Sequence, residues 1–129
     1  RENGEDPYDE ERNIKDTALE CLGICRTGSG LKKAVNYFSG LNKELSSLMK
    51  ANDLVDLQKA LEVRNLALAG EMVSRAALMR EESRGQHRRD DFPLRNDNEW
   101  LKWIVIHNHG DQVRLNTVPV PIDKYRVKP

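Results

Sequence analysis

Apolar residues recur every three or four positions along residues 14–79, and this spacing predicts three successive α-helices. A Gly-Ser-Gly sequence at residues 28–30 separates the first run from the second, and the helix-capping residues Asn52 and Asp53 precede the third. Asp9 is the expected cap of the first helix. The expected buried positions of the first two helices are Ile14, Ala18, Cys21, Leu22 and Cys25, then Leu31, Ala34, Val35, Phe38, Leu41, Leu45, Leu48 and Met49.

The third helix is expected to reach about Glu82, with Leu61, Leu68 and Met72 at the centre of the bundle. Asn65 interrupts its apolar seam, either as a buried amide with partners or because the seam turns and leaves it at the edge. The later half also carries a second apolar face of mostly small residues, so we expect packing on two sides. The seam is Leu54, Leu57, Leu61, Asn65, Leu68, Met72, Ala76 and Met79, and the second face is Leu66, Ala67, Ala69, Gly70, Val73 and Ala77.

Residues 83–129 follow a different pattern. Residues 83–98 mix charges with Gly85 and Pro93 and show no period, which predicts a long ordered loop or an extended segment. Aromatic and β-branched residues at 100–107 and 113–120 flank a turn-forming stretch, which predicts a β-hairpin with Gly110 at positive φ. Pro119 and Pro121 predict an extended basic tail. The expected fold is mainly α: a three-helix bundle at residues 1–82, with the ordered loop, hairpin and tail of residues 83–129 packed on it as one domain.

Composition excludes several classes of protein. The 129 residues suffice for one small domain and contain no run near the roughly 18 apolar residues that a membrane-spanning helix needs. Lys plus Arg and Asp plus Glu both total 21, so the chain lacks the positive field of a nucleic-acid or anionic-membrane binder. The chain begins at Arg1 without an apolar signal, which suggests a piece of a longer polypeptide. Its two cysteines are poorly spaced to cross-link a domain, and this favours the reducing cytoplasm.

Metal ligands are too few for a complete site in this sequence. Cys21 and Cys25 could supply two ligands, but a structural zinc ion needs about four, so we expect both to pack in the core. His87, His107 and His109 are the other candidate ligands. A polar turn explains the last two equally well, although a regular hairpin would place them on one side of a strand.

The glycine motifs do not satisfy a nucleotide-binding pattern. Residues 23–28 have the GxxxxG spacing of a phosphate loop, but Ser29 and Gly30 follow where Lys and then Ser or Thr are needed. Lys33 stands where a dinucleotide-binding fingerprint needs its third glycine, and no strand precedes either motif. We therefore expect no catalytic, cofactor-binding or metal-binding residues in this chain.

A run of mixed charge at residues 80–91 has two interpretations. A solvated surface is the default, in which Arg84 pairs only with Glu81 or Asp90. An ordered joint between domains is as well supported, because Gly85 could end the third helix in the left-handed conformation and the run leads into a Phe-Pro step.

Residues 82–93 read ESRGQHRRDDFP and residues 95–102 read RNDNEWLK, and these segments resemble the C-terminal domain of fumarate reductase and succinate dehydrogenase flavoproteins. The GICR and LKKA sequences at residues 23–26 and 31–34 resemble a helix junction of the same family. Gln86 and Trp103 replace residues that are usually Ala and often His there. L-aspartate oxidase shares the SRG-x-H run and is the near alternative; a freestanding helical interaction module is another.

The resemblance implies a three-helix bundle like a spectrin repeat, preceded in the parent protein by an FAD-binding domain and a capping domain that hold the cofactor and the dicarboxylate. This part is then noncatalytic. It implies that Arg84, Gly85, His87, Arg88 and Asp90 contact those domains or an iron–sulfur subunit, so that replacing Arg84 affects the parent more than this chain. It also implies electron transport in the cytoplasm, with membrane association through the parent complex open and neither nucleic-acid binding nor direct membrane insertion.

Overall fold

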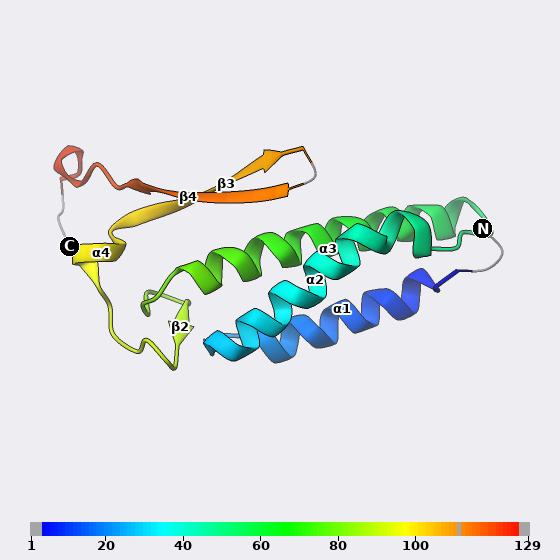
Figure 1. Ribbon diagram of the computed structural model, residues 1–129, viewed down its shortest axis with the longest axis horizontal. Helices are drawn as coiled ribbons and strands as arrows, with labels where there is room; N and C mark the ends of the chain where they lie inside the picture. Colours follow the sequence, from blue (N-terminus) through cyan, green and yellow to red (C-terminus); the bar gives the residue numbers. More distant parts are fainter. Residues whose placement is uncertain (1–3, 111, 127–129) are drawn as a thin grey trace.

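The computed structural model describes residues 4–110 and 112–126, and its main body is a bundle of three long helices. Helices α1 (Pro7–Leu22), α2 (Gly28–Leu48) and α3 (Leu54–Met79) lie side by side, and each runs in the direction opposite to the one before it (Figure 1). The predicted mainly α fold is confirmed. None of the helices in these described ranges is long and apolar enough to cross a bilayer.

The core of the bundle lies where α2 meets the other two helices. Large side chains of α2 pack there against smaller ones of α3, and the fully enclosed members include Leu31, Ala34, Phe38, Val63 and Ala67. Gly70 lets the helices approach closely, because a Cβ atom at this position would lie 2.5 Å from the Phe38 ring. Glu71 is also buried and accepts a 2.6 Å hydrogen bond from the amide of Asn42.

The buried stripe of α3 is not the predicted seam. Leu61 and Leu68 are 45% and 44% exposed and Met72 is half-buried, so their placement at the centre of the bundle was wrong. The stripe that faces the core is Val63, Ala67, Glu71, Ser74 and Ala77. Small residues occupy it because α2 supplies the bulk of the core from its side. Asn65 is exposed, as the prediction of a turned seam allowed.

Helix boundaries differ from the predicted ones at three ends. Asp6, not Asp9, caps α1, because its Oδ1 accepts the Tyr8 N–H at 2.9 Å and proline occupies the first turn. Helix α1 ends at Leu22, so Cys21 is buried but Cys25 lies beyond the helix and is exposed. Core packing is therefore confirmed for Cys21 alone. Helix α3 ends at Met79 rather than near residue 82.

Two short strands and a hairpin complete the described chain. Strand β1 (Cys25–Arg26) pairs in parallel with β2 (Arg88–Arg89), and α4 (Asp97–Trp100) leads into β3 (Lys102–His109) and β4 (Gln112–Pro119). The antiparallel pairing of β3 and β4 confirms the hairpin, and Gly110 has a φ of 66° as expected. A 3-10 turn, η1 (Ile122–Lys124), interrupts the tail that was predicted to be extended. Residues 1–3 of the acidic N-terminal segment, Asp111 of the turn and residues 127–129 of the tail lie outside the described residues.

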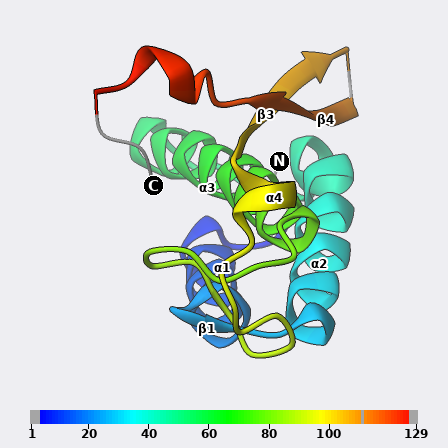
Figure 2. The same cartoon turned by 90° about the vertical axis from the view of Figure 1, so that its left-hand side faces the viewer.

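The hairpin lies over α3, on the side away from α1 (Figure 2). The chain reaches it through the loop that follows α3, where Gly85 has a φ of 58°. The predicted left-handed glycine is thus confirmed, but it turns the chain within residues 84–87 rather than ending the helix. This loop brings several charged side chains to the C-terminal end of α3.

Candidate functional site

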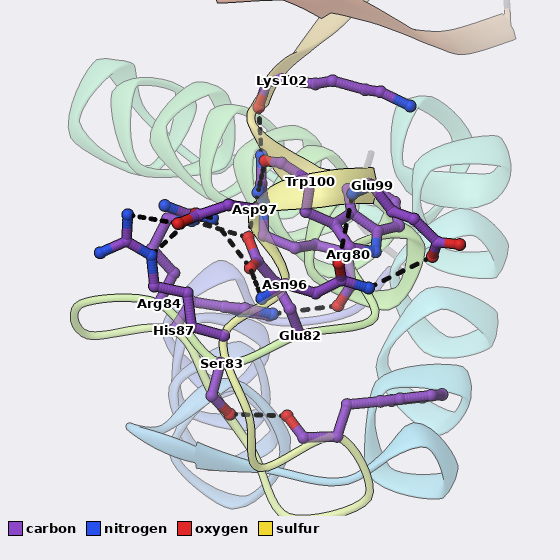
Figure 3. A network of polar contacts seen from close by, with 12 residues as sticks. Arg80, Glu82, Ser83, Arg84, His87, Asn96, Asp97, Glu99, Trp100 and Lys102 are labelled. Atoms are coloured by element: carbon purple, nitrogen blue, oxygen red, sulfur yellow. Dashed lines mark hydrogen bonds and ion pairs between the residues drawn. The ribbon is translucent and has the colours of Figure 1, made fainter. Parts of the chain in front are cut away.

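Charged side chains from five parts of the chain converge on the C-terminal end of α3, and Figure 3 labels five of them, Arg80, Glu82, Arg84, His87 and Asp97. They come from β1, from the residue that caps α3, from the loop after it, from β2 with the residues just after it, and from α4. We call this cluster the junction, and its members are Arg26, Arg80, Glu82, Arg84, His87, Arg89, Asp91 and Asp97.

Arg89 caps α3 from inside the protein. Its side chain is only 2% exposed, and Nη1 donates to the carbonyl oxygens of Ala77, Leu78 and Arg80 at 3.0, 3.2 and 3.2 Å. The last carbonyls of a helix have no partner within the helix and carry partial negative charge. A buried guanidinium satisfies both needs, so Arg89 holds the end of α3 in place.

Asp91 connects Arg89 to the start of α2. Its two carboxylate oxygens accept from Nε and Nη2 of Arg89, both at 2.7 Å, and Oδ2 also accepts the Gly28 N–H at 3.0 Å. The Arg89 guanidinium lowers the pKa of Asp91 to about 2. A carboxylate at the first turn of a helix is favourable for the same reason that a cation is favourable at the last turn. The pair therefore joins the C-terminus of α3 to the N-terminus of α2.

Glu82 is the buried acceptor at the centre of the junction. Its carboxylate is fully enclosed and accepts from Arg80 at 2.6 Å, from Arg84 at 2.7 and 3.0 Å, and from the Asn96 N–H at 2.9 Å. Burial would raise the pKa of Glu82, but the hydrogen bonds from Arg84, Asn96 and Arg80 outweigh it and hold the pKa below its usual value. Arg84 also donates to Asp97 at 2.6 Å, and these carboxylates raise the pKa of Arg84.

Arg80 ties the hairpin to the helices. Beyond its bond to Glu82, it donates to the carbonyl oxygens of Trp100 at 3.1 Å and Lys102 at 2.6 Å, and its guanidinium lies 5.3 Å from the Trp100 ring centroid. These residues form the end of α4 and the start of β3. The segment that leads from the bundle into the hairpin is therefore held by the side chain of Arg80, the residue that caps α3.

His87 is held between two arginines. Nη1 of Arg26 lies 2.9 Å from Nδ1, and Nε2 lies 3.1 Å from the Arg80 carbonyl oxygen. A guanidinium can only donate, so Nδ1 accepts and Nε2 carries the proton that it donates to the carbonyl. Burial lowers the pKa of His87, and the positive charges of Arg26, Arg89 and Arg80 lower it further, against the hydrogen bond to the Arg80 carbonyl, which raises it. Nε of Arg26 also donates to the carbonyl of Gly23 at 2.8 Å, just beyond α1.

The structure separates the five residues that the sequence assigned to partner contact. Arg84 and His87 lie within the junction, whereas Arg88 and Asp90 are 65% and 52% exposed and form a loose ion pair at 3.7 Å. Gly85 is exposed in the turn between Arg84 and His87. The predicted surface partners of Arg84 were wrong, because its carboxylate partners are Glu82 and Asp97.

Sequence reasoning missed six members of the junction: Arg26, Arg80, Glu82, Arg89, Asp91 and Asp97. Arg88 and Arg89 are neighbours of the same type, and only the pairing of β2 with β1 turns one outward and the other inward. One usable signal was present: Arg89 and Asp91 are two positions apart, the spacing that places side chains on one side of an extended segment.

Two backbone N–H groups at the start of α2 that could hold a phosphate already have acceptors within the chain. At the start of α2, the N–H of Gly28 already donates to Asp91 and that of Gly30 donates to Thr27 Oγ1 at 3.1 Å, so this turn does not fit a pyrophosphate of FAD. Within residues 4–110 and 112–126, no three His, Cys, Asp or Glu side chains are grouped as metal ligands. His107 instead faces Asn116 Oδ1 at 2.7 Å on the hairpin.

Comparison with known families gives a match over almost the whole chain. The family model described as fumarate reductase flavoprotein C-term matches residues 11–129. The chain is 33% identical over 94 residues to an FAD-dependent oxidoreductase of Methanocaldococcus jannaschii, covering 73% of this chain and 17% of the relative. It is 30% identical to the fumarate reductase flavoprotein subunit of Mycobacterium tuberculosis, covering 95% of this chain and 22% of that subunit. It is also 34% identical to an L-aspartate oxidase of Acinetobacter baylyi, over 62% of this chain and 14% of the enzyme.

Solved structures share the fold. Mycobacterium smegmatis Sdh1 in complex with UQ1 superposes with a TM-score of 0.77 at 29% identity, covering 90% of this chain and 20% of the solved one. A quinol-fumarate reductase with menaquinol molecules superposes with a TM-score of 0.84 at 23% identity, which shows likeness of fold alone, over 95% of this chain and 22% of the solved one. The chain thus spans about a fifth of the length of these proteins.

Proposed function

Since the chain belongs to the fumarate reductase flavoprotein C-terminal family, we propose that it is the helical C-terminal part of an FAD-dependent oxidoreductase that interconverts succinate and fumarate in electron transport. The observation that carries this proposal is the match of the family model to residues 11–129. The parent family is one of FAD-dependent flavoproteins. The reaction and its substrates belong, on this proposal, to the remaining four fifths of such a protein.

The chemical role of this part is structural. The cations that could bind a substrate carboxylate already have partners inside the chain: Arg89 bonds Asp91 and the end of α3, and Arg80 and Arg84 bond Glu82. Arg80 supports the proposal that residues 1–82 and 83–129 form one domain, because it bonds both the end of α3 and the start of β3. Coincident urea transitions of helix and hairpin signals would support one domain, and two separate transitions would refute it.

We propose that the turn at residues 84–90 contacts the neighbouring domains or an iron–sulfur subunit. Its internal residues hold the turn in shape and its exposed residues make the contact. Arg84 and His87 hold the turn through their internal hydrogen bonds. Gly85 permits a close backbone approach, and the exposed side chains of Arg88 and Asp90 reach the partner. Such a protein would work in the cytoplasm and meet the membrane only through its partner subunits.

A second candidate function is that of an L-aspartate oxidase, which the identity of 34% over 80 residues favours. Both candidates predict a flavin in the full-length protein, and assays with succinate, fumarate and L-aspartate separate them. A freestanding helical interaction module is the third interpretation. It predicts a full-length protein that lacks both flavin and a dinucleotide-binding fingerprint upstream of residue 1.

The decisive experiment is purification of the full-length protein that contains residues 1–129, followed by flavin spectroscopy and the three substrate assays. Bound flavin with succinate or fumarate turnover is the expected result, and a flavin-free protein would refute the oxidoreductase assignment. The contact role is tested by Arg88→Glu, with Lys32→Glu on the exposed side of α2 as the control. Only Arg88→Glu should lower flavin content or subunit assembly, and equal behaviour of the two variants would contradict that role.

A further inference from the structure

One side of α3 is apolar and uncovered. Leu54, Leu57, Leu61 and Leu68 are 83%, 47%, 45% and 44% exposed. Their spacings of three, four and seven residues place them on one side of the helix. At 3.6 residues per turn, this side lies roughly opposite the buried stripe that contains Val63. We call these four residues the leucine face.

The leucine face continues into a groove under the hairpin. Met79 follows Leu68 by eleven residues, which is about three full turns, so it extends the same row. An open groove of about 240 Å³ begins there, and it is mostly apolar. Its lining consists of Val35, Arg75, Leu78, Met79 and Leu115, the last of these from β4. Figures 1 and 2 show the hairpin above the C-terminal half of α3, with the rest of that side open.

Charge is absent from this row, although charged residues make up 33% of the chain. The row that the sequence analysis took as the seam contains no Asp, Glu, Lys or Arg from residue 54 to residue 79; its members are Leu54, Leu57, Leu61, Asn65, Leu68, Met72, Ala76 and Met79. Soluble monomers rarely expose large apolar patches, and Asn65 is the one polar residue among the members of this row. We therefore infer that this row packs against a surface that does not belong to the three-helix bundle.

We propose that the leucine face and the groove are the docking surface for the rest of the flavoprotein chain, which presents an apolar surface to them. This inference rests on the proposed function. The chain spans 17% of the Methanocaldococcus jannaschii relative and 22% of the Mycobacterium tuberculosis relative, so most of such a protein lies outside it. A 26-residue helix is about 39 Å long, the scale of an interface between domains. The row itself is uncharged, and the charged residue in the groove lining, Arg75, is paired with Glu71 of its own helix; this fits a permanent interface better than a transient one.

The place of the hairpin argues against a second copy of the chain as the occupant. The hairpin stands over the C-terminal half of α3 (Figure 1), so another α3 could not lie along the whole row. A domain surface can instead cover the open N-terminal half and send a side chain or a loop into the groove beside Leu115.

Thiol labelling tests the proposal. Leu61→Cys and the control Leu19→Cys, which is on α1 where the leucine is 80% exposed, are made in a background with Cys25→Ser. Maleimide labelling rates at each position are measured by peptide mass spectrometry in residues 1–129 alone and in the full-length flavoprotein. We expect labelling at position 61 to slow by at least about tenfold in the full-length protein, while the rate at position 19 changes by less than about threefold.

Three results would overturn the proposal. Equal rates at position 61 in the two proteins would show that nothing in the parent chain covers α3. Protection that arises only when the iron–sulfur subunit is added would assign the face to another chain. Protection of residues 1–129 alone that grows with concentration, together with a dimer by light scattering, would assign it to a second copy. Flavin absorbance of the same full-length sample tests the proposed function separately, since slow labelling of Leu61→Cys without flavin would refute only that function.

Discussion

Replacing Arg89 with alanine should destabilise the chain by about 3–5 kcal/mol, the cost of breaking a buried charged network from one side. The substitution removes a guanidinium that is 2% exposed and serves three carbonyl oxygens at the end of α3. Hydrogen bonds from a charged donor contribute about 1.5–3 kcal/mol each, but the three carbonyls share one Nη1, and water can reach part of the helix end after truncation. The loss is therefore well below the sum of three full bonds.

The partners of Arg89 other than the helix end add smaller amounts. Asp91 is 38% exposed, so water screens its pairing with Arg89, and we assign that pair about 1 kcal/mol or less. The guanidinium also lies 5.0 Å from the Phe92 ring centroid, a contact that contributes about 0.5–1 kcal/mol. With an unfolding entropy of about 2.1 cal/mol/K per residue, a loss of 3–5 kcal/mol corresponds to a melting temperature lower by about 11–18 °C for 129 residues.

Urea and thermal unfolding followed by circular dichroism would measure this effect. Arg88→Ala is a matched control, because Arg88 is the neighbouring arginine, is 65% exposed and should lose less than about 0.5 kcal/mol. Arg89→Lys keeps the charge but not the planar fork of donors, so it should recover only part of the loss. A difference below about 1 kcal/mol between Arg89→Ala and Arg88→Ala would refute the assignment of Arg89 as the cap of α3.

Three further predictions follow from the same structure. Because Leu68 is 44% exposed, Leu68→Ala should cost less than about 1.5 kcal/mol in urea melts, below the roughly 2–5 kcal/mol of a buried leucine. Gly70→Ala should cost about 1–3 kcal/mol, because its Cβ would lie 2.5 Å from the Phe38 ring, whereas Gly40→Ala meets no atom within 4 Å and should stabilise α2 by up to about 1 kcal/mol. Burial lowers the pKa of His87, so the unfolded chain binds this proton more readily; stability should be complete above the ordinary pKa of about 6.5 and fall as the pH decreases toward the folded pKa. His87→Gln should flatten that slope in unfolding measurements between about pH 5 and 7.5, and an unchanged slope would show that another group causes it.

Part of the site was predictable from the residues 82–93 alone. Gly85 carried its own signal, because a glycine between charged residues that break a helical pattern favours the left-handed region, and its φ is 58°. The alternative in which Arg84 pairs only with Glu81 or Asp90 at the surface is wrong. Its partners are the buried Glu82, two residues away, and Asp97, thirteen residues away beyond a loop whose path no local pattern determines. Whether the exposed Arg88 and Asp90 meet a partner stays a prediction.

The sequence by itself determined which segments are helical, where the hairpin forms and which glycines turn the chain, because these properties depend on residues within about four positions or on a neighbouring strand. Only the tertiary structure decided which face of α3 enters the bundle. The helix offers a row of small residues beside Val63 and a row of leucines on the far side, and both satisfy the same local periodicity. The bulk of Phe38 on α2 selects the small row, since the helices can approach closely only where Gly70 leaves room for its ring. Likewise, the buried charges of Arg89 and Glu82 are stable only once the ends of α2, α3 and α4 have been brought together, which is a property of the packed chain and not of any segment.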